Sequence, residues 1–190
     1  MPRLVHLNGP PGIGKSTLAT MYADQNPGVL NLDIDRLREL IGGWQERFAE
    51  TGALVRPLAL SMATTHLAAG HDVVMPQYLG DVKEVERFES AALSAGANFD
   101  SLALMDDKER SVDRFYRRDR AAAAGWDQYV LRIVEESGGR GLLGQMHDRL
   151  LDVIQQRPGT IVVPSVENAP AATFESFVTA LARIPSQGTA

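Results

Sequence analysis

The chain has 190 residues, 44% of them apolar, a formal net charge of −5 and no cysteine. These values are typical of a globular domain, and they exclude disulfides, thiolate metal sites and cysteine nucleophiles. The negative charge argues against a global basic field that would hold nucleic acid, and it leaves a local basic patch open.

The beginning of the chain does not resemble a targeting or membrane segment. Only four mostly apolar residues, Leu4–Leu7, precede the glycine- and proline-rich turn at Asn8–Pro11. A signal-peptide core or a membrane span needs a longer apolar run. We therefore expect a cytoplasmic protein without a membrane segment.

Short apolar segments alternate with helical patterns along the whole chain. In chain order, the patterns predict a strand at 4–7, a helix at 16–25, a strand at 29–32, helices at 35–41 and 57–69, a strand at 72–75, a helix at 82–95, a strand at 99–105, helices at 108–124, 127–136 and 142–156, a strand at 160–163 and a helix at 171–183. Residues 44–51 are ambiguous. This alternation indicates an α/β domain of three layers with a parallel sheet, in which the first strand is central.

The segment after the first strand matches the pattern G-x-x-x-x-G-K-[ST] of phosphate-binding loops in full. Its glycines allow the backbone to fold around an anion, and the following helix directs its positive end at the same point. The residues predicted to bind a nucleoside triphosphate are Gly9, Pro10, Pro11, Gly12, Ile13, Gly14, Lys15, Ser16 and Thr17.

Two residues of this loop have predicted chemical roles. We expect the Lys15 ammonium to reach the β- and γ-phosphate oxygens during catalysis, and the Ser16 hydroxyl to ligate Mg²⁺. The loop alone indicates ATP or GTP binding, and does not identify a reaction.

Two carboxylates follow the second strand. The carboxyl ends of parallel strands lie beside the first loop, so Asp33 and Asp35 are candidates for chemistry. Asp35 is the candidate general base for an acceptor hydroxyl, and Asp33 is a second candidate base or a partner of the metal. The alternatives are a helix N-cap for Asp35 and a surface turn for Asp33. Arg36 and Arg38 could hold an anionic acceptor.

Residues 8–17 and 26–38 together resemble the opening of small P-loop kinases, including AAA-like and zeta-toxin-like members. They are similar to the kinase domain of polynucleotide kinase, to chloramphenicol phosphotransferase and to the tunicamycin-resistance proteins. The resemblance implies a five-stranded parallel sheet in the order 2-3-1-4-5, with helices on both faces. It also implies a single domain over 1–190 with a helical lid at about 110–140, ATP and Mg²⁺ as cofactors, and Asp35 as the base.

The third strand departs from the pattern of many such enzymes, which place a metal-associated carboxylate at its end. Here the strand ends in Met75-Pro76-Gln77. Either Asp33 replaces the missing carboxylate, or Mg²⁺ is held by Ser16, phosphates and water. The tunicamycin-resistance proteins resemble the chain at this point, and Gln77 either contacts the acceptor or is a plain polar strand end.

The helix after the fourth strand is rich in arginine. In small kinases this helix leads into a lid whose arginines neutralise the charge on the transferring phosphoryl group. Arg114 and Arg118 are the candidates for this role. The alternative is a solvated helix whose arginines pair with Asp113 and Asp119.

Other residues give weaker indications. Ser165–Ala169 lies where related kinases pack the adenine ring, and the four histidines have no metal-ligand spacing. Trp44 and Trp126 are predicted to be packing residues, with acceptor platforms as the alternative.

The sequence therefore predicts an ATP-dependent phosphotransferase that moves the γ-phosphate to a hydroxyl of a small acceptor, antibiotic-like or nucleoside-like. One alternative is a polynucleotide 5′-kinase, so nucleic acid is not excluded as a partner. Another is an ATP-binding resistance or regulatory module that sequesters a ligand with little turnover. The sequence is also compatible with a homodimer.

Overall fold

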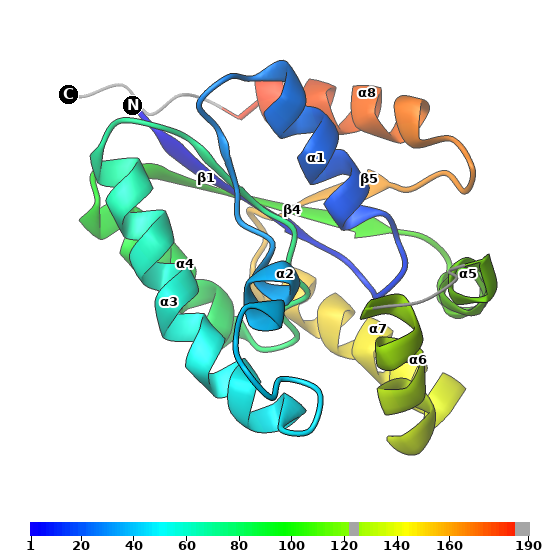
Figure 1. Ribbon diagram of the computed structural model, residues 1–190. Helices are drawn as coiled ribbons and strands as arrows, with labels where there is room; N and C mark the ends of the chain where they lie inside the picture. Colours follow the sequence, from blue (N-terminus) through cyan, green and yellow to red (C-terminus); the bar gives the residue numbers. More distant parts are fainter. Residues whose placement is uncertain (122–125, 185–190) are drawn as a thin grey trace.

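Five parallel strands form one sheet in the order β2-β3-β1-β4-β5 (Figure 1). The computed structural model describes residues 1–121 and 126–184, without the side chains of 118–121. The strands are β1 (Arg3–Asn8), β2 (Leu30–Asn31), β3 (Val73–Met75), β4 (Asn98–Met105) and β5 (Ile161–Pro164). The α/β class and the strand order that the resemblance implies are both confirmed.

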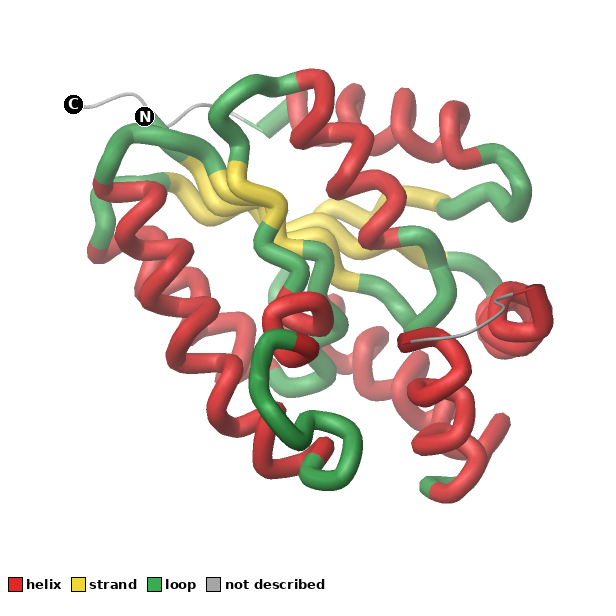
Figure 2. Tube along the Cα trace, in the orientation of Figure 1, coloured by secondary structure: helices red, strands yellow, loops and turns green. Residues whose placement is uncertain are grey.

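Helices cover both faces of the sheet, which gives three layers (Figures 1 and 2). One face carries α1 (Lys15–Gln25) and α8 (Pro170–Ala182), and the other carries α3 (Phe48–Ala68), α4 (Val82–Ser94) and α7 (Gly139–Gln156). Three further helices lie toward the carboxyl ends of the strands: α2 (Ile34–Glu39), α5 (Lys108–Ala121) and α6 (Trp126–Glu136).

The central strand β1 is buried on both faces, as its apolar run predicts. Leu4 packs in the cluster that includes Phe88 of α4, whereas Val5 packs in the opposite cluster with Phe177 of α8. Alternate residues of one strand therefore anchor the two helical layers. This places the loop after β1 at the middle of the carboxyl edge of the sheet.

Helix α3 begins nine residues before the predicted start at Pro57, which lies inside the helix. Proline removes one backbone donor and normally marks a helix start. Here a buried stripe extends along one face of α3 on both sides of Pro57, at Thr51, Gly52, Val55, Ala59, Ala63 and Leu67. Packing of this stripe against the core overrides the local signal, and it resolves the ambiguous segment into turns at 41–47 followed by helix.

Helices α5, α6 and α7 pack around a separate apolar cluster, formed by Val112, Phe115, Val134 and Leu143. Helix α7 begins at Gly139, three residues before the predicted start. Residues 122–125, which the predicted helix 108–124 includes in part, lie outside the described residues.

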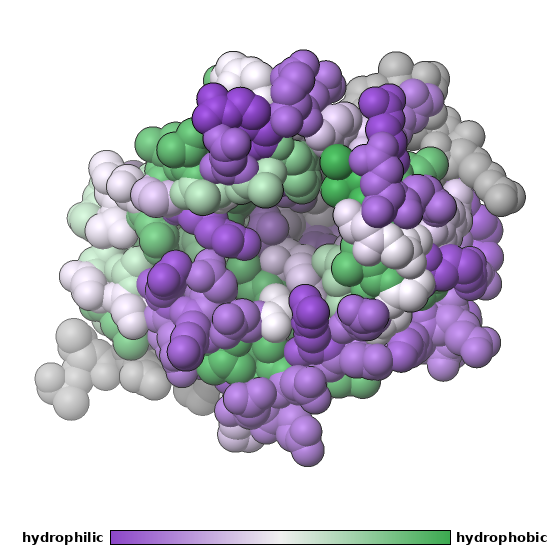
Figure 3. All heavy atoms as spheres, turned by 90° about the horizontal axis from the view of Figure 1, so that it is seen from below, coloured by the Kyte–Doolittle hydropathy of each residue, from purple (hydrophilic) through white to green (hydrophobic). Residues whose placement is uncertain are grey.

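The surface is mixed in character. Polar residues cover most of the face seen in Figure 3, with smaller apolar patches between them and a hollow near the middle. None of the helices within 1–121 and 126–184 combines the length and the apolar character needed to cross a membrane.

Candidate active site

The phosphate loop connects β1 to α1 at the carboxyl edge of the sheet. Gly14 adopts a φ of 104°, in a conformation that a side chain would strain, and it caps α1 without a side-chain hydrogen bond. The first N–H groups of α1 therefore remain available for an anion, and the helix dipole favours negative charge there.

Gly12 brings the loop into contact with α5. Its φ is 78°, and a Cβ on this residue would lie 2.9 Å from the Cα of Phe115. Any larger residue would force the loop and α5 apart. Phe115 is itself 1% exposed, so the contact is between two fixed parts of the structure.

The Lys15 ammonium lies against the loop that contains it. Its Nζ donates to the carbonyls of Gly9 and Pro10, each at 2.9 Å. These bonds hold the positive charge at the mouth of the loop, where phosphate oxygens would compete for it.

Asn8, which the sequence analysis overlooked, fixes the start of the loop. Its side chain is buried; it accepts from the N–H groups of Gly9 at 2.9 Å and Leu79 at 3.1 Å, and it donates to the Leu79 carbonyl at 2.9 Å. Asn8 therefore ties the loop to the segment after β3. An amide at the end of an apolar strand was the available signal.

A cavity of about 650 Å³ opens on one side of the loop, and we call it the Ser165 cavity. Gly12–Gly14 and Thr17 form one wall, and the segment Ser165–Asn168 after β5 forms another. Asn168 has a φ of 57°, the only positive value among the described residues other than glycine. The predicted adenine-binding segment and the phosphate loop thus line one cavity.

Arg114 fastens these two walls together. Its guanidinium donates to the Ile13 carbonyl at 3.2 Å, to the Ser165 carbonyl and hydroxyl at 3.1 and 3.2 Å, and to Asp106 at 3.2 Å. The side chain is 10% exposed and lines the Ser165 cavity. The structure therefore places this predicted lid arginine beneath the loop.

Two charged residues of α5 whose side chains the structure describes, Arg117 and Asp113, pair with residues outside this helix. Arg117 forms a two-pronged ion pair with Glu167 at the rim of the Ser165 cavity, with N–O distances of 2.9 and 3.0 Å. Asp113 pairs with Arg140 of α7 instead of an arginine on its own helix. The side chains of Arg118 and Asp119 lie outside the described residues.

A second cavity, of about 460 Å³, opens on the other side of the loop, and we call it the Asp35 cavity. Gly12 lines both cavities, so the loop separates them. The Asp35 cavity brings together residues from five segments of the chain: Pro11, Gly12, Lys15, Ser16, Asp33, Asp35, Arg36, Glu39, Pro76, Phe115, Trp126, Asp127 and Val130.

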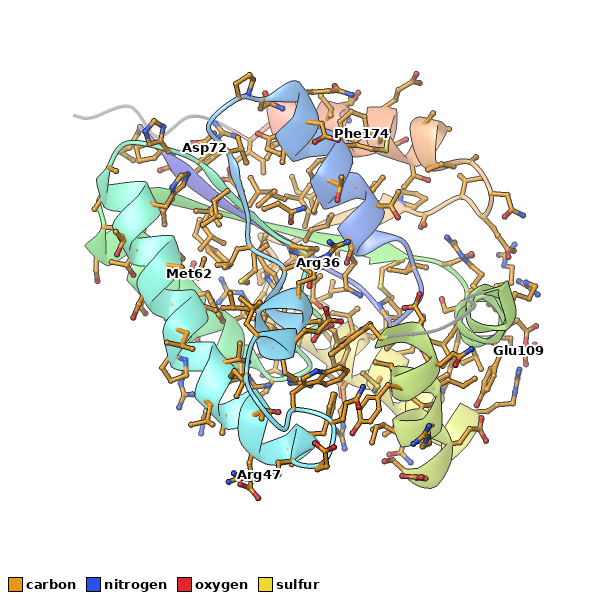
Figure 4. The ribbon with its side chains drawn as sticks, viewed as in Figure 1. Arg36, Arg47, Met62, Asp72, Glu109 and Phe174 are labelled. Carbon is orange, nitrogen blue, oxygen red and sulfur yellow. The ribbon has the colours of Figure 1, made fainter. Side chains whose placement is uncertain are left out.

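The predicted residues Lys15, Ser16, Asp33 and Asp35 all line this cavity. Arg36 lines it as well, and it projects from α2 toward the amino end of α1 (Figure 4). Glu39 and Asp127 add carboxylates that the sequence analysis did not identify. Their signal was weak, because each is one charged residue on a predicted helix.

Asp33, and not Asp35, caps helix α2. The Asp33 carboxylate accepts from the N–H of Asp35 at 3.1 Å, so the predicted capping role belongs to the first aspartate. Burial raises the pKa of Asp35, and the negative charge of Asp33 raises it further, whereas Arg38 and Lys15 oppose the rise. A carboxylate with a raised pKa is a better proton acceptor.

Arg38 does not line the cavity, and it packs beneath aromatic rings. Its guanidinium carbon lies 4.0 Å from the centre of the Phe48 ring and 6.0 Å from that of Trp126. Burial lowers the pKa of Arg38, and the Asp35 charge opposes this effect. Arg38 thus links α2, which carries both aspartates, to α3 and α6.

The end of β3 supplies no carboxylate, as the sequence indicates. Pro76 lines the Asp35 cavity, whereas Gln77 is absent from its lining and accepts through its carbonyl from Nε2 of the buried His6 at 2.9 Å. Asp81 caps α4 and lines a separate groove. Asp33, the predicted replacement, does line the Asp35 cavity.

The part of the chain that the structure describes contains no group of three or more histidines or acids placed to hold a metal. The Ser16 hydroxyl and the Asp33 carboxylate nevertheless line one cavity. Mg²⁺ commonly takes one or two such oxygens and completes its shell with phosphates and water. The donor set fits that mode.

Comparisons with known proteins agree with the fold described above. A family model described as an AAA domain matches residues 4–132. Among solved structures, the tunicamycin resistance protein of Deinococcus radiodurans has a TM-score of 0.60 and 18% identity, over 95% of this chain and 96% of that chain. A gluconokinase from Sinorhizobium meliloti 1021 has a TM-score of 0.63 and 17% identity, over 96% and 93%.

A Chloroflexus aurantiacus protein, provisionally described as a kinase, has a TM-score of 0.65 and 18% identity, over 95% of this chain and 96% of that chain. A comparison with curated protein sequences finds no match. At these identities the solved structures show the fold, and the matched model covers more than half of the chain. The chain therefore belongs to the AAA domain family, and its fold is that of the small P-loop kinases.

Proposed function

We propose that the protein is an ATP-dependent phosphotransferase that moves the γ-phosphate of ATP to a hydroxyl of a small-molecule acceptor. The observation that carries the proposal is the position of the phosphate loop between two cavities, with Asp35 in the second. A nucleotide in the Ser165 cavity would direct its terminal phosphate across the loop. An acceptor in the Asp35 cavity would then approach that phosphate.

Asp35 acts as the general base. The acceptor oxygen forms a bond to the γ-phosphorus while the bond from that phosphorus to the β–γ bridging oxygen breaks, and the hydroxyl proton passes to the Asp35 carboxylate. ADP leaves with the bonding electron pair. The raised pKa of Asp35, caused by its burial and by the charge of Asp33, supports this role, because a carboxylate with a raised pKa accepts a proton more readily.

Lys15 neutralises phosphate charge. Its two hydrogen bonds to loop carbonyls show that the ammonium is already at the loop, so a small rotation would exchange these partners for phosphate oxygens. Mg²⁺ would be held by Ser16 and Asp33, and it would supply further neutralisation of the phosphates.

The two predicted lid arginines take different roles in this proposal. Arg118 keeps the role of clamp on the γ-phosphate. Arg114 becomes a positioning residue, because its bonds to Ile13 and Ser165 hold the phosphate loop against the segment proposed to contact the adenine ring.

The test is transfer of label from [γ-³²P]ATP to a panel of hydroxyl-bearing antibiotics, nucleosides and sugar acids, separated by thin-layer chromatography. We expect one class of acceptor to acquire label with the wild-type protein. The Lys15→Met variant should transfer at least about a hundredfold more slowly. Tight binding of an acceptor without any transfer would contradict the proposal and favour a sequestering module.

A further inference from the structure

Both charged and apolar groups line the Asp35 cavity. Lys15, Ser16 and the two aspartates form a polar wall on the side of the phosphate loop. Pro76 from the end of β3, with Trp126 and Val130 from α6, contributes apolar surface. Asp127 of the same helix and Arg36 and Glu39 of α2 add further charged groups, so an acceptor that fills this cavity meets both kinds of surface.

Trp126 is held in place by an aromatic cluster, which we define as Trp44, Phe48, Trp126 and Tyr129. The Trp44 and Trp126 rings stack with their centres 5.1 Å apart and their planes at 30°. The Trp44 ring also meets the Tyr129 ring edge-on, with their centres 4.9 Å apart, and the centres of the Phe48 and Trp126 rings are 6.1 Å apart. The Tyr129 hydroxyl donates to the Gln45 carbonyl. The indole is thus preorganised by contacts within the chain.

The aromatic cluster is also connected to Asp35, the candidate general base. Arg38 lies on the helix that carries Asp35, and its guanidinium stacks on Phe48 of the cluster. Arg38 therefore connects the helix that carries Asp35 to the cluster that contains Trp126. A molecule that packs against the indole would present its neighbouring groups to Asp35 at a defined place.

This arrangement favours one class of acceptor. A flat ring buries apolar area against Trp126 and Pro76 and gains from ring contacts, whereas a linear polyol would leave these groups without a matching surface. We propose that the acceptor carries a planar, largely apolar ring beside the hydroxyl that is phosphorylated, and that Trp126 selects this ring. The inference rests on the proposed function, because it names the acceptor class of the same site.

The test uses two probes that share the same sugar hydroxyls, phenyl β-D-glucopyranoside and methyl β-D-glucopyranoside. Their binding to the wild-type protein is measured by calorimetry in the presence of Mg²⁺ and a non-hydrolysable ATP analogue. We expect the phenyl compound to bind at least about tenfold more tightly, because burying one aromatic ring contributes at least that factor.

Three variants locate the preference. Trp126→Leu should reduce the ratio of the two dissociation constants to near one, and Val130→Thr, which keeps the shape but adds a hydroxyl, should reduce it severalfold. Leu58→Ala, at an exposed position on α3 outside the cavity lining, should keep the wild-type ratio. If Trp126→Leu does not fold, as judged by circular dichroism, Val130→Thr decides.

Equal binding of the two probes, no binding of either, or a ratio that survives both cavity substitutions would overturn the inference. The measurement needs no turnover, so its outcome is separate from that of the proposed function. A ring preference without phosphoryl transfer would leave the inference standing and remove the kinase proposal. Phosphoryl transfer without a ring preference would support the kinase proposal and overturn the inference about the acceptor.

Discussion

At the scale of single residues, the site depends on the neighbouring carboxylates Asp33 and Asp35. One caps α2 and the other follows it with a raised pKa. Both line the Asp35 cavity, and the negative charge of Asp33 is one of the causes that raise the pKa of Asp35. The charge of Asp33 therefore tunes the basicity of Asp35.

Asp33→Asn should move the acidic limb of the pH–rate profile to lower pH. Asparagine keeps the helix cap but removes the negative charge that raises the pKa of Asp35. The base works when ionised, so a lower pKa keeps it active at lower pH. The measurement is kcat/KM against pH at saturating Mg²⁺, which separates this effect from any weaker metal binding. An unshifted or upward-shifted limb would show that Asp33 does not tune the base.

Sequence reasoning found these residues because the phosphate loop and the strand end are local patterns. The helix cap that it gave as the alternative role of Asp35 belongs to Asp33, because the boundary of α2 depends on one backbone conformation that neither side chain reveals. It also missed Asn8, whose partner Leu79 lies on another segment.

At the scale of elements, α5 joins the two walls of the Ser165 cavity. Its Arg114 bonds to the phosphate loop and to the segment after β5. Pairing between distant segments of this kind cannot be read from a run of arginines. The sequence indicated that the helix was important, and the structure shows that one of its arginines is a buried connector.

Arg114→Leu should weaken ATP binding about tenfold and cost about 2 kcal/mol of stability. The change removes the Arg114 donor from the Ser165 carbonyl and leaves the Ile13 carbonyl with the Ser165 hydroxyl as its remaining side-chain donor. Arg110→Leu is the matched control, because Arg110 also pairs with Asp106 but is 70% exposed. The control should change stability by less than about 0.5 kcal/mol. Calorimetry and urea unfolding give both values, and equal effects in the two variants would contradict the connector role.

The aromatic cluster shows a second limit of prediction at this scale. Trp44 and Trp126 were predicted to be packing residues; both pack, and Trp126 also lines the Asp35 cavity. Their contact joins the turn before α3 to α6. It depends on the true start of α3 at Phe48, which the proline at 57 disguised.

At the scale of the whole molecule, the three layers follow from the alternation of apolar strands and helices, whereas the strand order was implied by the resemblance to small P-loop kinases. The central strand also carries a buried histidine, His6, which packs near Phe99 and bonds to the Gln77 carbonyl. Burial lowers its pKa to about 4. This group links the stability of the fold to pH.

The free energy of unfolding should fall as the pH is lowered from about 6.5 to 4, with His6 contributing about 3 kcal/mol of the loss. The folded state keeps His6 neutral over this range while the unfolded chain takes up a proton, so the stability is present above pH 6.5 and is lost below it. His6→Gln should flatten the profile. Urea unfolding at several pH values measures this, and an unchanged slope in His6→Gln would refute the assignment.

The central claim is that Asp35 receives the acceptor proton during phosphoryl transfer from a nucleotide bound at the phosphate loop. The most direct measurement compares wild type and Asp35→Asn for single-turnover transfer from [γ-³²P]ATP and for ATP binding by calorimetry. We predict that transfer slows by at least about a hundredfold while the ATP dissociation constant changes less than about threefold. Equal loss of both, or transfer at the wild-type rate, would contradict the account.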